Sequence, residues 1–178
     1  HGGYGKSNLL MNLSMKGGWE AGTGWYVNAN TFKTYPYMAE WIKTWNNAIK
    51  RGAFVVNGDY TSEIQDAMRH AWTNGRIWTL TETVKDQEWI LQEVSKANPE
   101  QTIGEPITLY ATKNIDIEEQ ENGDIATSTS LDYSRAHTGV EVTLYTQPHT
   151  NYRLAGNSVK VTAADGTECK LTPVEGEE

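Results

Sequence analysis

Apolar residues in the first hundred positions recur at helical spacing in some segments and form short continuous runs in others. Between residues 34 and 51 they fall on one face of a predicted helix, for which Pro36 suits the first turn: Met38, Trp41, Ile42, Trp45 and Ile49. Gly52 ends this segment. Residues 53–56 are then a continuous apolar run, which is typical of a strand covered on both faces.

The alternation continues along the chain. Ser62 and Gln65 form a capping-box pattern before an apolar stripe, so a second helix is expected to run to Gly75. Strands are predicted at 76–81 and 107–112, a third helix at 83–97 and a further strand at 8–13. Helices that alternate with strands predict right-handed crossovers onto a largely parallel sheet, so the expected fold class is α/β.

After residue 105 the pattern changes to short β-rich runs. Asn122-Gly123 predicts a two-residue hairpin turn between strands at 114–119 and 124–130. Further strands are expected at 140–145, 158–163 and 168–171, the last two joined by Asp165-Gly166. The chain is therefore expected to contain two domains, an alternating helix/strand domain at 1–104 and an all-β accessory domain at 105–178.

Composition and net charge argue against several classes of binding partner and cofactor. The chain has 178 residues and a formal net charge of −8, so most of its surface would repel a nucleic acid backbone. The longest uncharged apolar run is far shorter than the roughly 20 residues that cross a bilayer, so we expect no membrane insertion. The single cysteine, Cys169, excludes an internal disulfide and a cysteine-rich zinc site. No cofactor is predicted.

Residues 139–171 carry a partial family resemblance. The segments that carry it are 139–144, Pro148, 151–154 and 158–168, which include Ser158-Val159-Lys160-Val161-Thr162 and Asp165-Gly166. This pattern resembles the divergent internalin-B-type, immunoglobulin-like (Ig-like) β-repeats of bacterial surface proteins. The resemblance implies an Ig-like or β-grasp-like fold and an extracellular or cell-surface location on a modular bacterial protein, with a phage virion as the alternative.

Two carboxylates follow predicted strands of the α/β part. Asp59 comes after the run 53–56, and Glu82 comes after residues 76–81. Because ligands of parallel sheets lie at the carboxyl ends of the strands, both side chains could point into one cleft. Glycoside hydrolysis uses such a pair, one as acid and the other as base or nucleophile. The simpler alternative is that Asp59 is a turn residue and Glu82 a solvated residue near a helix cap.

Aromatic content supplies the second candidate site. The chain has seven Trp and nine Tyr. Four of the Trp lie on or beside apolar helical stripes and are predicted to belong to the core: Trp41, Trp45, Trp72 and Trp89. Trp19, Trp25 and Tyr26 instead lie in a glycine-rich loop, where aromatic faces are available to bind sugar rings or another protein.

No metal site is predicted. Glu63, Asp66 and His70 have helical spacing that would place them on one face, but a solvated polar face is the favoured explanation.

The leading hypothesis is an extracellular bacterial surface or secreted module that binds or processes carbohydrate. The alternative is a non-catalytic structural or adhesive protein, such as a surface filament subunit or a phage virion component. A third possibility is that 1–104 belongs to a larger (β/α) enzyme. The expected partner is a glycan or another surface protein, and the oligomeric state stays open.

Overall fold

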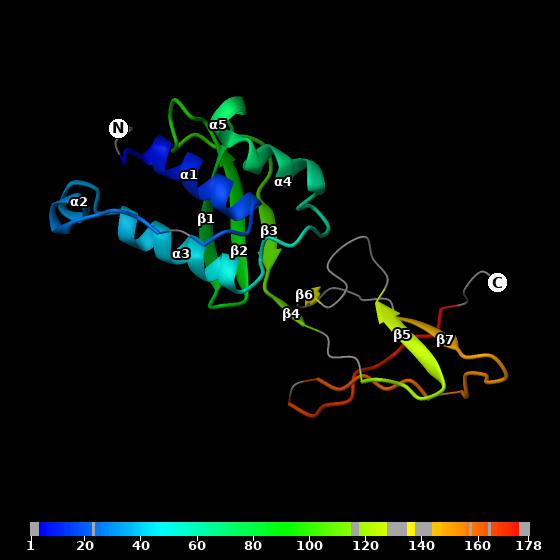
Figure 1. Ribbon diagram of the computed structural model, residues 1–178. Helices are drawn as coiled ribbons and strands as arrows, with labels where there is room; N and C mark the ends of the chain where they lie inside the picture. Colours follow the sequence, from blue (N-terminus) through cyan, green and yellow to red (C-terminus); the bar gives the residue numbers. More distant parts are fainter. Residues whose placement is uncertain are drawn as a thin grey trace. The chain divides into compact units, whose positions relative to one another are not determined.

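The computed structural model describes residues 4–22, 24–114, 118–127, 135–137, 144–156, 158–163 and 165–174. Its helices are α1 (Lys6–Gly18), α2 (Ala29–Thr34), α3 (Met38–Lys50), α4 (Ser62–Arg69) and α5 (Ala71–Asn74). Its strands are β1 (Ile77–Val84), β2 (Glu88–Val94), β3 (Ile107–Tyr110), β4 (Thr112–Asn114), β5 (Gly123–Thr127), β6 (Arg135–His137) and β7 (Leu144–Pro148). Figure 1 labels these elements.

The chain forms two compact units. The first comprises His1–Asp116 and Thr129–Val142, and the second comprises Ile117–Ser128 and Thr143–Glu178. In the first unit β1, β2 and β3 form an antiparallel sheet in chain order. The predicted parallel sheet is therefore wrong, and among the described residues every strand pair is antiparallel.

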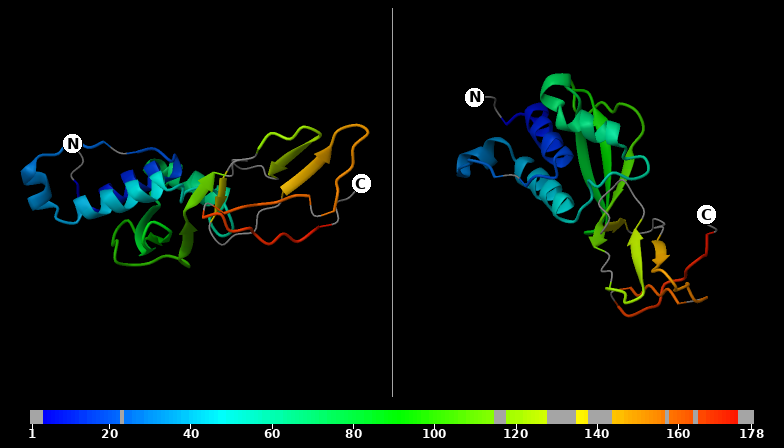
Figure 2. Two further views of the ribbon diagram at one scale, coloured as in Figure 1. Left: turned by 90° about the horizontal axis from the view of Figure 1, so that it is seen from below. Right: turned by 45° about the vertical axis from the view of Figure 1, so that its right-hand side comes forward.

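Helices α1 and α3 pack on one face of this sheet against β1, and α4 packs on α1 (Figures 1 and 2). The strands alternate accordingly, because successive side chains of a strand point to opposite faces. Five side chains of the strands lie buried beneath the helices: Trp78, Leu80, Trp89, Leu91 and Leu109. Thr79, Ile90 and Thr108 lie between them and remain partly accessible. Antiparallel sheets often have one solvent-exposed face, whereas parallel sheets are usually covered on both faces.

Three predicted elements have the wrong type. The predicted third helix at 83–97 is instead the β1–β2 turn followed by β2, whose central position gives its backbone partners on both sides. The predicted strand at 8–13 is part of α1, in which Leu9, Leu13 and Gly17 repeat every four residues and are buried. Residues 53–55 are buried as expected, but they form a turn and no strand.

Other predicted elements are confirmed. The first predicted helix is α3, and the second is α4 continued by α5. β1 starts within the segment 76–81 and runs on to Val84, and the segment 107–112 contains β3. Gly75 has φ +69° and ends α5, as a C-terminal cap should.

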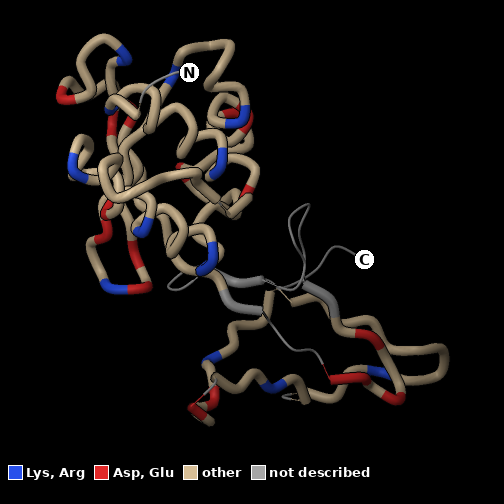
Figure 3. Tube along the Cα trace, turned by 60° about the vertical axis from the view of Figure 1, so that its left-hand side comes forward, with Lys and Arg blue, Asp and Glu red and all other residues tan. Residues whose placement is uncertain are grey.

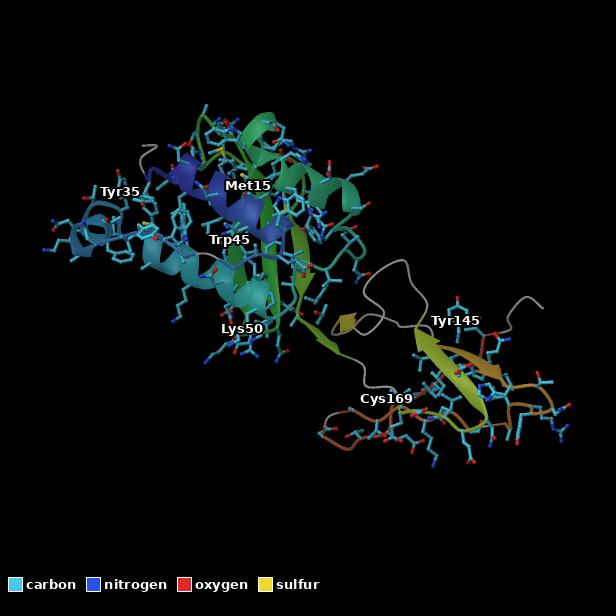
Figure 4. The ribbon with its side chains drawn as sticks, in the orientation of Figure 1. Met15, Tyr35, Trp45, Lys50, Tyr145 and Cys169 are labelled. Carbon is cyan, nitrogen blue, oxygen red and sulfur yellow. The ribbon has the colours of Figure 1, made fainter. Side chains whose placement is uncertain are left out.

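The core of the first unit gathers three fully buried Trp side chains, Trp45, Trp78 and Trp89. Trp45 stacks on Phe54 with ring centres 5.4 Å apart, and Figure 4 shows it between α1 and α3. Ser14 is also fully buried, and its hydroxyl accepts a hydrogen bond from the Trp78 backbone N–H at 3.0 Å. This bond ties the middle of α1 to the start of β1.

The second unit pairs β5 with β7 in an antiparallel two-stranded sheet. The predicted hairpin at Asn122-Gly123 is wrong, because β5 begins at Gly123 and takes residues 144–148 as its partner. The Asp165-Gly166 turn is confirmed: Gly166 has φ +87°, and a bridge joins Thr162 to Glu168. Residues 115–117, 128–130, 140–143 and 175–178 lie outside the described residues. The described residues form neither an Ig-like nor a β-grasp-like arrangement.

Helix α1 ends in a Schellman motif with an unusual residue. The Ala21 N–H donates to the Lys16 carbonyl at 2.9 Å, and the Glu20 N–H donates to the Gly17 carbonyl at 3.0 Å. Glu20 occupies the left-handed position of this motif with φ +50°. Glycine is the residue that normally takes this position, because a Cβ atom is strained there.

Replacing Glu20 with glycine should therefore raise the free energy of unfolding by about 1 kcal/mol. Urea denaturation followed by tryptophan fluorescence measures this change. Glu20→Ala is the matched control, because it removes the carboxylate but keeps the Cβ atom. Equal stabilisation by both variants would show that charge, and not backbone strain, is the cause.

Candidate ligand-binding site

Five aromatic side chains form a row at the end of the first unit where the N-terminal segment meets the start of α3. Trp25 contacts Tyr4 with ring centres 5.9 Å apart, and Tyr4 contacts Tyr35 at 5.9 Å. Tyr35 contacts Tyr37 at 6.3 Å, and Tyr37 contacts Trp41 at 4.7 Å. All five side chains are partly exposed. We call Tyr4, Trp25, Tyr35, Tyr37 and Trp41 the aromatic row.

Local sequence explains how α2 and α3 present this row. The Asn28 side chain accepts from the backbone N–H groups of Asn30 and Thr31 and caps α2. The α2–α3 connection then places Tyr35 and Tyr37 on either side of Pro36, and Trp41 follows one helical turn after Tyr37. Figure 4 shows Tyr35 beside α2.

Hydrogen bonds hold the row to the segments behind it. The Tyr37 hydroxyl donates to the Tyr4 carbonyl at 2.8 Å, and the Tyr4 hydroxyl donates to the Tyr26 carbonyl at 3.0 Å. Edge-to-face contacts between the rings add to these bonds. The rings are therefore held in place before any ligand arrives.

A cation lies beside the row, and it also pairs with the Glu100 carboxylate at 3.7 Å. The Lys6 ammonium lies 5.7 Å from the centre of the Tyr37 ring, within cation–π distance. Partial burial, with a smaller effect of Tyr35, raises the pKa of Tyr37, so its hydroxyl stays protonated and can donate. The buried Trp25 Nε1–H has no hydrogen-bond acceptor among the described residues.

The predicted binding residues divide between two places. Trp25 belongs to the aromatic row, and the neighbouring Tyr26 side chain is fully exposed. Trp19 lies elsewhere, at the C-terminal end of α1, where it is 57% exposed and stacks under the Arg69 guanidinium at 4.6 Å.

The Trp residues assigned to the core from sequence also divide. Trp45 and Trp89 are buried, which confirms that prediction. Trp72 is 71% exposed, so its assignment to the core is wrong. Trp41 is partly exposed and extends the row. The sequence signal for the row was the density of aromatic residues around Pro36, which helical periodicity alone did not separate from the core.

The two carboxylates lie in different elements. Asp59 is exposed in the turn 57–60, which is closed by hydrogen bonds between the backbones of Asn57 and Tyr60. Glu82 lies within β1, and its Oε2 accepts from the Asn47 Nδ2 at 3.1 Å and from the Asp86 N–H at 3.3 Å. The expected common strand edge does not exist, because the sheet is antiparallel.

The Glu82 carboxylate instead helps to fix the β1–β2 turn. Asn47 also donates to the Asp86 Oδ1 at 2.9 Å, and Arg51 pairs with the Asp86 Oδ2 at 3.2 Å. Asp86 has φ +59°, a conformation that these contacts stabilise. Glu82 is thus a structural residue that joins the end of α3 to the turn.

No group of three or more His, Cys, Asp or Glu side chains in the described part of the chain could hold a metal ion. His70 follows the last residue of α4. Its Nδ1 lies 2.9 Å from the Asp66 carbonyl oxygen and 3.4 Å from the Asp66 carboxylate. Lys and Arg are interspersed with Asp and Glu along the described chain (Figure 3). No described helix has the length and apolar character that a bilayer crossing requires.

Neither a protein-family model, nor a curated protein, nor a solved structure matches this chain.

Proposed function

We propose that the protein is a carbohydrate-binding module of a secreted or surface-exposed bacterial protein, and that the aromatic row is its ligand platform. The observation that supports this most directly is that Tyr4, Trp25, Tyr35, Tyr37 and Trp41 are contiguous and all partly exposed. A row of rings that served only the core would be buried, as Trp45, Trp78 and Trp89 are.

Sugars fit such a surface for a physical reason. One face of a pyranose ring carries C–H groups, which pack on aromatic rings, while its hydroxyls remain available to polar groups. The row offers both, because the hydroxyl oxygens of Tyr4 and Tyr37 can still accept hydrogen bonds while they donate to backbone carbonyls, and the Lys6 ammonium lies near the Tyr37 ring. Because hydrogen bonds already hold the rings, binding would cost little ordering entropy.

Binding without hydrolysis fits the carboxylates better. Hydrolysis of a glycosidic bond needs two carboxyl groups that flank the scissile bond. Asp59 occupies a turn and Glu82 is committed to Asn47 and Asp86. The extracellular location rests on the resemblance of residues 139–171 to surface-protein repeats, with a virion as its alternative.

One observation favours the alternative of an adhesive or structural subunit. The second unit has a two-stranded sheet and exposes several large apolar side chains: Tyr145, Tyr152, Leu154, Leu171 and Val174. Two-stranded sheets have unpaired edges and are marginal alone, which favours pairing with another chain. Concentration-dependent assembly in light scattering, together with no binding on a glycan array, would support this alternative.

The test of carbohydrate binding combines a glycan array with calorimetric titration of any glycan retained. Trp41→Ala and Tyr35→Ala should each lower the affinity by about tenfold, since a stacked ring contributes about 1 kcal/mol or more. Trp72→Ala is the matched control, because Trp72 is exposed but lies outside the row. An equal loss in the control, or wild-type affinity in Trp41→Ala, would contradict the assignment.

A further inference from the structure

The pair formed by Trp19 and Arg69 is a second aromatic surface, separate from the aromatic row. The Trp19 side chain remains 57% exposed although the Arg69 guanidinium carbon lies 4.6 Å from its ring centre. Stacking therefore covers only part of the indole. The remaining surface is available to a ligand that also contacts the guanidinium edge.

Both side chains are held in place by the crossing of α1 and α4. The Arg69 Nε–H donates to the Gly18 carbonyl at 2.7 Å. The helices touch through their backbones here, because a Cβ atom on Gly18 would lie 2.8 Å from the Arg69 nitrogen. Trp19 directly follows Gly18 as the C-terminal cap of α1. Little side-chain freedom remains to be lost on binding.

Arg69 differs from Arg51 and Arg76 in its ion pairing within the described part of the chain. Arg51 pairs with Asp86, and Arg76 forms a two-point pair with Glu93. Within the described residues no carboxylate lies within 4.0 Å of Arg69, and no acceptor is bonded to its terminal amino groups. A guanidinium with two free amino groups matches the two oxygens of a carboxylate.

The charged groups Glu20 and Arg69 set the electrostatic potential near this pair. Burial and the negative charge of Glu20 raise the pKa of Tyr60, while the charge of Arg69 acts in the opposite sense. Glu20 therefore lies near enough to oppose an anionic ligand in part. Its removal should strengthen binding of an anion at Arg69.

We propose that Trp19 and Arg69 form a subsite for an acidic sugar, whose ring packs on the Trp19 indole and whose carboxylate accepts hydrogen bonds from the Arg69 amino groups. The sugar class rests on the proposed carbohydrate function, whereas the carboxylate specificity rests on the unpaired guanidinium. Binding at the two sites can be measured separately. The indole N–H signals of Trp25 and Trp41 detect a ligand at the row, and that of Trp19 detects a ligand at this subsite.

The experiment titrates ¹⁵N-labelled protein with a glucuronic acid oligosaccharide and with its neutral glucose counterpart, and follows the indole N–H signals. The acidic sugar should shift the Trp19 signal and bind at least about tenfold more tightly there than the neutral one. Trp19→Ala and Arg69→Gln should each weaken this binding about tenfold, and Glu20→Gln should strengthen it. Trp72→Ala serves as the control.

Three outcomes would overturn the proposal: no shift of the Trp19 signal, equal affinity for the acidic and neutral sugars, or unchanged affinity in a folded Arg69→Gln variant. Arg69→Lys provides a second test if Arg69→Gln does not fold, because it keeps the charge but loses the two-point contact. Shifts at Trp25 and Trp41 with none at Trp19 would leave the proposed function intact and contradict only this subsite.

Discussion

Replacement of Trp45 by alanine is expected to lower the free energy of unfolding by about 3–5 kcal/mol. Trp45 is 1% exposed and stacks on Phe54 at 5.4 Å. It also touches α1, because a Cβ atom on Gly17 would lie 2.8 Å from its ring. Its removal would leave a cavity where α1, α3 and the residues after α3 meet. Urea denaturation monitored by circular dichroism measures the loss.

The control for this prediction is Trp72→Ala. Trp72 is also a helical tryptophan, but it is 71% exposed, so its removal should change the stability by no more than about 0.5 kcal/mol. Equal losses in the two variants would contradict the assignment of Trp45 to the core and of Trp72 to the surface.

Replacement of Gly18 by alanine should destabilise the protein by about 1–3 kcal/mol. Alanine normally stabilises a helix by about 1 kcal/mol relative to glycine, so the sign of the change is itself the test. The added Cβ atom would lie 2.8 Å from the Arg69 backbone nitrogen and 3.1 Å from the Gln65 carbonyl oxygen. Because both are backbone atoms, α1 and α4 must move apart to admit it.

Gly22→Ala is the matched control, because no atom lies within 4 Å of a Cβ atom built there. It should leave the stability unchanged or raise it by about 0.4–1 kcal/mol, through a less flexible unfolded chain. Stabilisation by Gly18→Ala, measured in the same urea titration, would refute the close helix crossing. It would also remove the rigid support that Arg69 and Trp19 need in the proposed subsite.

The helices that the sequence predicted correctly are those with a clear one-sided apolar stripe. The stripe of α3 combines Met38, Trp45 and partly buried Trp41, and its spacing excludes a strand. Capping residues marked the start of α4 in the same way, although the capping side chain is Thr61 and not Ser62. Local chemistry sufficed here because neighbours along the chain determine it.

The errors arose where short apolar runs suit either structure. Residues 8–13 are apolar on several sides because α1 is covered by both the sheet and α4, so its pattern resembles a buried strand. In β2, Ile90, Leu91 and Val94 also fit helical spacing. Backbone pairing with β1 and β3 decided that segment, and such pairing depends on residues far along the chain.

The candidate site shows the same division. Sequence selected Trp19, Trp25 and Tyr26 from loop composition, but of these only Trp25 belongs to the aromatic row. The row also contains Tyr4, Tyr35, Tyr37 and Trp41. Their proximity follows from how the N-terminal segment, the glycine-rich loop and α3 pack together. The expected convergence of Asp59 and Glu82 assumed a parallel sheet whose strand ends share an edge, and the sheet is antiparallel.

The sequence by itself determined the helical amphipathicity of α3, the turn at Asp165-Gly166 and the abundance of aromatic residues, because local spacing and backbone preference specify these features. Only the tertiary structure decided that the sheet is antiparallel, that Glu82 supports a turn and that five rings form one partly exposed row. These depend on contacts between distant segments, which burial and hydrogen bonding select only when the whole chain folds.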